Sequence, residues 1–347
     1  MKNLFICHSQ SHLILATGLT SKRFSQDLND LILFKDFNVR EDLIVCLEQV
    51  FDSCSYLEGT YPAAKNMTFF GRVKWYKKDV DILREYLTKR YDRVFAVCDW
   101  TYPVQYAIKR CIDNNPDVEV NWLEDGILPY YANLKSRKGL DKYKFTMWLR
   151  KLFFRHVMRL GRVYDRDFME MGGLTVFRKA YISYPDAVRE PYRNKKELIE
   201  ITNEEFRSGI SLLYPSYSIN VLDNSILLIM DKLDTYLYPE EVKAVIYDLI
   251  RRAHDEGVSV YCKLHPRENQ HWDVLDKIIM LDKTMGAESM YLSLLPQSGS
   301  IRVIGFKSAG LMTARKMGFT VTSLFLESGE TNEDLVSFFR LIGIELK

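Results

Sequence analysis

The sequence predicts an α/β protein built from two Rossmann-like domains that face a central cleft. Short apolar runs alternate with amphipathic helical stretches through most of the 347 residues, a length that suffices for two ordinary domains. The alternation restarts after a polar, proline-containing stretch near residue 190. Several of the apolar runs end in charged residues, and the carboxyl ends of parallel strands are where such sheets bind ligands.

The first half begins with a strand, a polar turn and a helix. We expect strands at 3–7, 29–34, 43–46, 93–98 and 118–123, where β-branched and other apolar residues are concentrated. Apolar spacing predicts helices from about residue 13, over 72–90 and over 104–113. No G-x-G-x-x-G follows the first strand, so a dinucleotide-dependent dehydrogenase loses most of its support.

The second half repeats this pattern. Expected strands are 225–230, 258–264, 290–294, 301–306 and 320–325, and expected helices are 239–255, 270–279, 309–317 and 331–341. Residues 195–213 are expected to form polar helical pieces. We therefore expect an N-terminal domain of residues 1–190 and a C-terminal domain of residues 191–347. Two such domains with a cleft between their strand ends are typical of the GT-B architecture of glycosyltransferases.

Composition excludes several classes of protein. Hydrophobic residues at 47% and charged residues at 27% describe a globular chain, and a net charge of +2 does not indicate nucleic-acid binding. The six cysteines are scattered without metal-ligand spacing, which fits free thiols in a reducing compartment. No apolar run is long enough for a signal peptide or a membrane span. We expect a cytoplasmic protein.

Residues 135–166 form a strongly basic segment. Eleven lysines and arginines stand here against Asp141 and Asp165, and aromatic residues such as Trp148 are interleaved with them. This pattern suits peripheral contact with an anionic membrane surface, here the inner face of the cytoplasmic membrane. The alternative is a solvated helix face over a core stripe.

The first candidate site is Glu124-Asp125-Gly126, which follows the strand at 118–123. Neighbouring side chains on a strand point in opposite directions, so only one carboxylate need face a ligand, where it could act as a general base. Gly126 permits a sharp turn of the backbone. The alternative is an acidic strand end that caps the next helix.

The second half contributes two cationic strand ends. Lys263 and His265 lie on one face at the carboxyl end of the strand at 258–264, and Pro266 ends that strand. We therefore expect an anionic ligand there. Lys307-Ser308 precede the helix at 309–317, where a Ser N-cap and free amides would suit a phosphate. The alternatives are that His265 is an ordinary structural histidine and that Ser308 is an ordinary helix cap.

Two Asp-x-Asp pairs are candidate metal ligands. Asp79 and Asp81 lie within an expected helix and are expected to be solvated, whereas Asp165 and Asp167 follow the basic segment. The lysines and the helix start already supply positive charge for a phosphate, so we expect no metal cofactor. No P-loop, nucleophile elbow or zinc spacing occurs.

Taken together, these stretches resemble bacterial sialyltransferases, especially glycosyltransferase family 52 and the related polysialyltransferases. The resemblance rests on an acidic-acidic-Gly motif at Glu124-Asp125-Gly126, a His-Pro motif at His265-Pro266 and the region of Ser308, in this order over most of the chain. The polar turn with His12 after the first strand also matches. Where the family often has two hydroxyl residues, this chain has Lys307-Ser308.

The resemblance implies an inverting, metal-independent sialyltransferase that uses CMP-sialic acid as its donor. Asp125, or else Glu124, would deprotonate a hydroxyl, expected on galactose, of a bacterial surface glycan such as lipooligosaccharide, O-antigen or capsule. His265 and Ser308, with Lys263 or Lys307, would stabilise the departing phosphate, and Pro266 and Gly126 would lie at the donor. Asp99, Trp100 and Tyr102, at another strand end, are the candidates for the acceptor side.

Other interpretations remain open from the sequence. A transferase of the same fold could use CMP-Kdo or a UDP-hexose, and a non-catalytic nucleotide- or glycan-binding protein could keep the fold. The residues also leave open the linkage, single or repeated transfer, and the formation of a homodimer. A nucleic-acid partner is not expected, because no recognition motif accompanies the basic segment.

Overall fold

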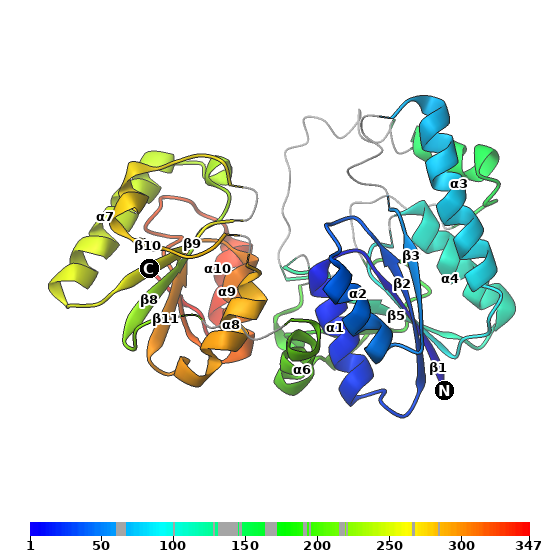
Figure 1. Ribbon diagram of the computed structural model, residues 1–347, viewed down its shortest axis with the longest axis horizontal. Helices are drawn as coiled ribbons and strands as arrows, with labels where there is room; N and C mark the ends of the chain where they lie inside the picture. The colour runs from blue at the N-terminus through cyan, green and yellow to red at the C-terminus, as the bar shows by residue number, and fades with distance from the viewer. Residues whose placement is uncertain are drawn as a thin grey trace. The chain divides into compact units, whose positions relative to one another are not determined.

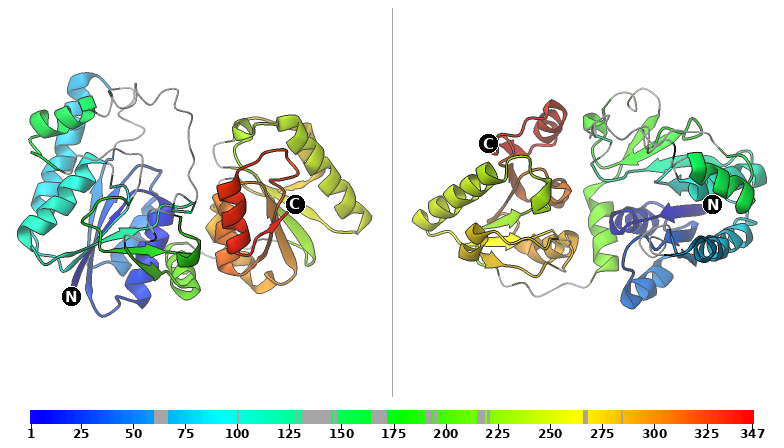
Figure 2. Two further views of the ribbon diagram at one scale, coloured as in Figure 1. Left: turned by 180° about the vertical axis from the view of Figure 1, so that it is seen from behind. Right: turned by 90° about the horizontal axis from the view of Figure 1, so that it is seen from above.

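The protein is described by a computed structural model that divides into two compact units, residues Met1–Leu213 and Tyr214–Lys347 (Figures 1 and 2). The described residues are 1–59, 67–99, 101–127, 129–130, 145, 148–163, 172–189, 193, 196–214, 219, 221–265, 268–283 and 285–347. Each unit is an open, parallel α/β sheet, as predicted.

Unit 1 contains a seven-stranded parallel sheet in the order β3-β2-β1-β4-β5-β6-β7. Its strands are β1 (Lys2–Cys7), β2 (Leu28–Phe34), β3 (Ser53–Leu57), β4 (Arg93–Ala96), β5 (Glu119–Leu123), β6 (Lys179–Ile182) and β7 (Glu197–Glu200). The central strand β1 is buried on both faces, which explains its continuous apolar run. Phe5 on β1 pairs in register with Phe95 on β4, and their rings stack at 4.5 Å.

Helices cover both faces of this sheet, with α1, α2 and α6 on one face and α3 and α4 on the other (Figure 1). Their bounds are α1 (Gln10–Lys22), α2 (Glu41–Val50), α3 (Phe69–Tyr86), α4 (Tyr102–Asn114) and α6 (Asn203–Leu213), with η2 (Phe153–Val157) and η3 (Pro185–Ala187) as short helical turns. The first half is therefore doubly wound, as its alternating pattern predicts.

Unit 2 contains a six-stranded parallel sheet in the order β10-β9-β8-β11-β12-β13. Its strands are β8 (Ser225–Ile229), β9 (Val260–Lys263), β10 (Ile279–Met280), β11 (Ile301–Gly305), β12 (Thr320–Ser323) and β13 (Glu345–Leu346). Its helices are α7 (Pro239–Asp255), α8 (Ala287–Leu294), α9 (Ala309–Met317) and α10 (Glu333–Leu341), with η4 (Leu233–Thr235), η5 (Asp273–Lys277) and η6 (Leu295–Gln297) as short helical turns. No helix among the described residues of either unit is long and apolar enough to cross a membrane.

Four local predictions were wrong in whole or in part. Of residues 195–213, expected to be helical pieces, Glu197–Glu200 form strand β7 and the helix begins at Asn203. Residues 43–46 lie within α2 and residues 290–294 within α8, so both apolar runs are helical instead of extended. In α2 the buried residues Leu43 and Leu47 are four positions apart, the spacing of one helix face. The helix expected at 270–279 is instead a short 3₁₀ turn followed by the edge strand β10.

The division between the units lies at residues 213 and 214, later than the expected boundary near residue 190. Strand β7 pairs with β6 and α6 packs against α1, so residues 197–213 complete the first unit. Two glycines allow this helix pair to approach closely. A Cβ on Gly18 would meet the backbone of Glu205, and one on Gly209 would meet the backbone of Ile14, both well inside 3.0 Å.

Replacing Gly209 with alanine should therefore destabilise unit 1. The new methyl group would force α6 away from α1, and we expect the free energy of unfolding to fall by about 2 kcal/mol or more. This loss should exceed the roughly 1 kcal/mol that alanine gains over glycine in a helix. Gly299→Ala is the matched control, because a Cβ there meets nothing within 4 Å. Equal stability of the two variants in denaturant unfolding would contradict the close helix contact.

Candidate functional site

In unit 1 the chain reverses its winding between β1 and β4, the neighbouring strands at the centre of the sheet. Open α/β sheets bind ligands beside such a topological switch point, beyond the carboxyl ends of the strands. Residues that follow β1, β4 and β5 meet here: His8 and His12 after β1, Cys98 after β4, and Asp125 after β5. This strand-end group is the candidate site of unit 1.

Asp125 follows the end of β5 and its backbone turns at Gly126, whose φ of +55° suits glycine. The Asp125 side chain keeps 22% of its surface exposed, and its Oδ1 lies 2.9 Å from Nε2 of His12. Burial alone would raise the pKa of this carboxyl group. The hydrogen bond from His12 and the charges of His12 and His8 together outweigh burial and hold the pKa of Asp125 below its ordinary value, so Asp125 is ionised at neutral pH.

His12 lies in the first turn of α1 and is almost fully buried. The backbone amide of His8 donates a hydrogen bond to Nδ1 of His12 at 3.2 Å. Because Nδ1 accepts, the neutral ring carries its proton on Nε2, which therefore donates to Asp125. The fold thus fixes both the orientation and the tautomer of His12.

His8 is itself held firmly, which keeps its amide aimed at His12. Its ring stacks on Phe34 at 4.2 Å, and Nδ1 lies 2.8 Å from Oδ2 of Asp36, which follows β2. Burial lowers the pKa of His8 despite the opposing effect of Asp36. A neutral, packed His8 is therefore part of the support for the His12–Asp125 pair.

The second carboxylate oxygen of Asp125 has a different environment. Among the described residues its one recorded polar neighbour is Cys98, whose Sγ lies 4.0 Å away. Burial raises the pKa of the Cys98 thiol well above its usual range, so this thiol is neutral. Oδ2 is therefore the oxygen through which Asp125 can accept a proton.

Glu124 has the opposite character. Its carboxylate is buried, and it accepts hydrogen bonds from the backbone amide of Ser183 at 2.5 Å, the Ser183 hydroxyl at 3.1 Å and the hydroxyl of Tyr130. These bonds tie the end of β5 to the residue after β6. The two adjacent carboxylates therefore differ. Glu124 is buried and makes structural hydrogen bonds, whereas Asp125 is partly exposed to solvent.

The residues expected on the acceptor side have structural contacts. Asp99 is buried and accepts hydrogen bonds from the amides of Gly172 and Leu174 at 2.9 and 3.1 Å. The hydroxyl of Tyr102 donates to the carbonyl of Gly161, and the Tyr102 ring stacks on Phe154. Trp100 lies outside the described residues. These contacts give no support to acceptor binding by Asp99 or Tyr102.

In unit 2 the winding reverses between β8 and β11. Asp231 follows β8, while Lys307 and Ser308 follow β11 and lead into α9. The Ser308 hydroxyl caps α9 by accepting from the amide of Gly310 at 3.2 Å, as predicted for a helix N-cap. The helix start therefore lies beside the switch point, where its partial positive charge favours an anion.

Lys307 makes several contacts within unit 2. Its Nζ lies 2.8 Å from Oε2 of buried Glu330 and above the ring of Tyr236, and its backbone amide donates to Asp231 at 3.2 Å. Burial raises the pKa of Asp231 to about 6. The sequence interpretation missed Asp231 and Glu330. Asp231 could have been identified from the sequence, because it is a polar residue directly after the expected strand at 225–230.

Lys263, at the end of β9, has fewer partners. The residue is buried, and among the described residues its ammonium group makes one recorded hydrogen bond, to the carbonyl of Leu264 at 3.2 Å. Burial lowers the pKa of Lys263, opposed by the charges of Glu288 and Asp282. His265 follows it, half-buried, and Pro266 lies outside the described residues.

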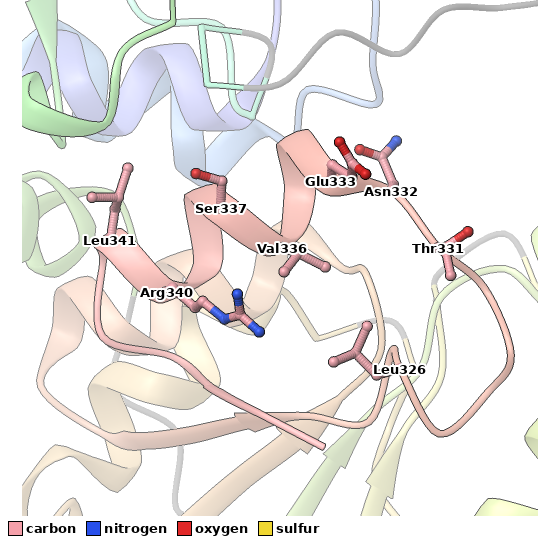
Figure 3. Close-up of a pocket in the computed structure, with 8 residues that line it drawn as sticks. All are labelled: Leu326, Thr331, Asn332, Glu333, Val336, Ser337, Arg340 and Leu341. Atoms are coloured by element: carbon pink, nitrogen blue, oxygen red, sulfur yellow. The ribbon is translucent and has the colours of Figure 1, made fainter.

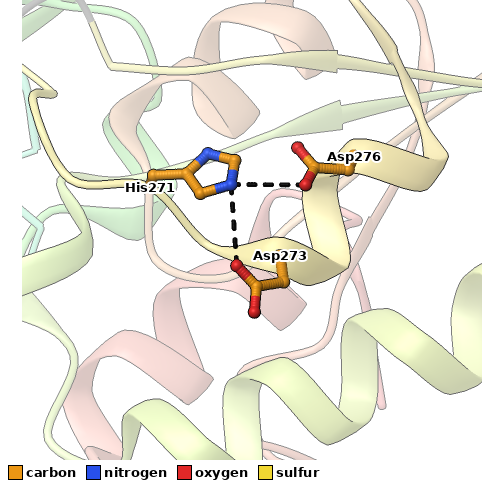
Figure 4. Close-up of side chains that lie close together, drawn as sticks. All are labelled: His271, Asp273 and Asp276. Atoms are coloured by element: carbon orange, nitrogen blue, oxygen red, sulfur yellow. Dashed lines mark ion pairs between the residues drawn. The ribbon is translucent and has the colours of Figure 1, made fainter.

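One group of described side chains could hold a metal ion, namely His271, Asp273 and Asp276 (Figure 4). Nε2 of His271 lies 3.6 Å from Asp273 and 3.3 Å from Asp276. All three residues are exposed, and exposed groups of this kind commonly form in water without an ion. The expectation that Asp79 is solvated was wrong, because Asp79 is buried and accepts hydrogen bonds from the amides of Glu58 and Gly59, while Asp81 pairs with Arg84. Asp165 and Asp167 lie outside the described residues.

A pocket of about 470 Å³ lies beside α10 in unit 2 (Figure 3). Aliphatic side chains from Leu326, Val336 and Leu341 line it together with Arg340 and Glu333. None of the residues that the sequence analysis singled out contributes to this pocket. The pocket therefore shares no lining residue with either strand-end group.

Comparison with known proteins gives one family and a set of shared folds. The family model described as "Alpha-2,8-polysialyltransferase (POLYST)" matches residues 4–324. No curated protein matches the sequence significantly.

The similar solved structures are distant in sequence. A UDP-GlcNAc 2-epimerase from Neisseria meningitidis is 12% identical, with a TM-score of 0.52 over 93% of this chain and 82% of its own. One from Methanocaldococcus jannaschii is 10% identical, with a TM-score of 0.54 over 99% and 92%. These likenesses concern the fold alone, and the predicted class of two Rossmann-like domains of the GT-B type is confirmed.

Proposed function

The chain belongs to the alpha-2,8-polysialyltransferase family and is therefore a sialyltransferase, and we propose that it moves sialic acid from CMP-sialic acid to a hydroxyl of a bacterial surface glycan. The transfer inverts the anomeric centre and needs no metal. The observation that carries the proposal is the ionised Asp125, oriented by His12 at the switch point of unit 1.

Asp125 is the general base in this proposal. The acceptor hydroxyl gives its proton to Oδ2 of Asp125 while its oxygen forms a bond to the anomeric carbon of sialic acid. The bond between that carbon and the phosphate oxygen breaks, and CMP departs with the electron pair. A positioned base of this kind typically contributes 10²–10⁴-fold to a rate.

Unit 2 stabilises the departing phosphate in this proposal. Lys263 supplies a buried ammonium group with one hydrogen bond recorded among the described residues, and the start of α9 with Ser308 supplies a partial positive charge. His265 lies next along the chain from Lys263 and Leu264, and it donates a hydrogen bond to the same phosphate. Lys307 is already paired with Glu330, so we assign it to holding the loop after β11. Fixed charges aimed at a leaving group are commonly the largest catalytic contribution.

The acceptor is the finer part of the proposal. The sequence interpretation favours a terminal galactose, whereas the description of the matching family names an alpha-2,8 linkage and a polymer, for which the acceptor would be sialic acid itself. Both are hydroxyl acceptors that Asp125 would deprotonate in the same way. Peripheral contact of residues 135–166 with the inner face of the cytoplasmic membrane would bring the enzyme to glycans assembled there.

The test is release of CMP from CMP-sialic acid in EDTA, with a galactose-terminated acceptor, a sialic-acid-terminated acceptor or none. Acceptor-stimulated release in EDTA would support the proposal, and the better acceptor would identify the product. CMP-Kdo and UDP-hexoses are assayed in parallel. Turnover of one of these alone would overturn the donor assignment. Binding of CMP without any turnover would indicate a non-catalytic protein of the same fold.

Replacing His12 with phenylalanine should move the acid limb of the kcat/KM profile to higher pH. Without the donated hydrogen bond, burial dominates and the pKa of Asp125 rises, so the base becomes protonated at a higher pH than in the wild type. Loss of orientation should lower the rate by up to roughly 10²-fold. His12→Gln keeps an N–H donor and should restore the acid limb. A rate loss with an unmoved limb in both variants would make His12 a packing residue only.

A further inference from the structure

Two helical segments of unit 1 that are distant in sequence lie side by side, and together they form a surface that we call the basic aromatic face. The segments are α3 and residues 148–162, of which 148–157 are helical (Figures 1 and 2). Tyr76 of α3 contacts the rings of Phe153 and Phe154, and Arg84 donates to the carbonyls of Met158 and Arg159. The two segments therefore form one structural element.

Large apolar side chains are exposed on this face. Phe70, at the start of α3, is 82% exposed, and Phe145 and Trp148 are 60% and 53% exposed, with their rings 5.9 Å apart. Leu149 and Val157 are also exposed. Scattered exposed apolar residues are ordinary, but four of them on two adjacent segments, with Phe145 beside Trp148, indicate a surface with a partner.

The same face is strongly basic. Residues 148–163 contain Arg150, Lys151, Arg155, Arg159 and Arg162 and no acidic residue. Helix α3 adds Arg72, Lys74, Lys77, Lys78 and Arg84. Lys78 pairs with Glu58 and Arg84 with Asp81, and Asp79 is buried under two backbone amides. These acidic residues and Glu85 are fewer than the lysines and arginines, so the two segments keep an excess of positive charge.

We propose that the basic aromatic face binds the surface of a bilayer that contains anionic phospholipids. Trp148, Phe145 and Phe70 enter the interfacial layer, where aromatic rings are favoured, while the surrounding lysines and arginines contact lipid phosphates. The proposal deepens the membrane contact suggested under the proposed function, because it adds α3, which the basic segment at 135–166 does not include.

The charge pattern favours this partner over the other candidates. A second copy of the chain would bring two basic faces together, and the like charges would repel. A nucleic acid would satisfy the cations, but it would leave the aliphatic side chains of Leu149 and Val157 in contact with a polar backbone. An anionic bilayer satisfies the cations and removes the apolar side chains from water.

The test is co-sedimentation of the full chain with vesicles of phosphatidylcholine alone or mixed with phosphatidylglycerol. We expect binding to the mixed vesicles that weakens with salt. Lys74→Gln should lower the partition constant about fivefold, because one cation near an anionic surface has about that effect. Trp148→Ser and Phe70→Ser should each lower it by a similar or larger factor. Quenching of tryptophan fluorescence by brominated lipid should be present in the wild type and reduced in Trp148→Phe.

Matched control substitutions lie in unit 2. Leu341 is 63% exposed on α10 and Lys277 is exposed at the end of η5, so Leu341→Ser and Lys277→Gln should bind vesicles as the wild type does. Equal losses in the control variants, or binding unchanged in Lys74→Gln and Trp148→Ser, would overturn the proposal. Preferential binding of single-stranded RNA would also overturn it. The readout is vesicle binding, so its failure is distinguishable from failure of sialyl transfer.

Discussion

Asparagine in place of Asp125 is expected to reduce acceptor-stimulated CMP release by roughly 10²–10⁴-fold, the contribution of a positioned general base. The substitution keeps an oxygen that accepts the hydrogen bond from His12, so the fold should remain intact. It removes the group that takes the acceptor proton. The measurement is kcat/KM for the acceptor at neutral pH, with the melting temperature recorded for the same preparation.

Glu124→Gln is the matched control, since it makes the same chemical change one residue earlier. Glu124 accepts three hydrogen bonds from Tyr130 and Ser183, so this variant should lose stability while its folded fraction keeps its turnover. If Glu124→Gln abolishes turnover of folded protein and Asp125→Asn does not, the base is Glu124.

Methionine in place of Lys263 is the second change with a large expected effect. The variant loses the ammonium group that we assign to the donor phosphate, and the KM for CMP-sialic acid should rise by roughly 10–10²-fold, as expected for a charged hydrogen bond. Stability should stay the same or rise, because burial disfavours the charged form of Lys263.

The pH dependence of donor binding follows from the same residue. Since burial places the pKa of Lys263 below its ordinary value, its contribution to phosphate binding is present at low pH and is lost as the pH rises through that lowered pKa. Lys263→Met should lack this alkaline loss. Titration of CMP binding over the alkaline range, by calorimetry, measures it.

Lys307→Met is the contrasting control, at the end of β11, which β8 separates from β9 in the sheet. This change leaves buried Glu330 without its ion-pair partner, so we expect the free energy of unfolding to fall by roughly 2–3 kcal/mol, less than for a fully buried pair because Lys307 is partly exposed. Donor affinity of the folded variant should change little. A stable Lys307→Met protein that no longer binds CMP would reverse the roles of the two lysines.

Much of the fold could be predicted from sequence alone. The strands β1, β4 and β8 contain continuous apolar runs, which is the pattern of strands buried on both faces, and Ser308 and Pro239 mark helix starts through local backbone chemistry. The short runs in α2 and α8 could not be resolved, because an apolar run of four or five residues fits a buried strand and a buried helix face equally well.

The candidate residues were also visible in the sequence, since Asp125, Lys263 and Ser308 follow apolar runs. The different roles of these residues could not be predicted from the sequence. Asp125 and Glu124 differ through partners far along the chain, with His12 113 positions before Asp125 and Ser183 59 positions after Glu124. Lys263 and Lys307 differ in the same way, because only Lys307 has Glu330 beside it. Local sequence determines where a strand ends and which chemical groups are placed there. The ionisation and accessibility of those groups depend on long-range hydrogen bonds and burial, which exist only once the sheet has assembled.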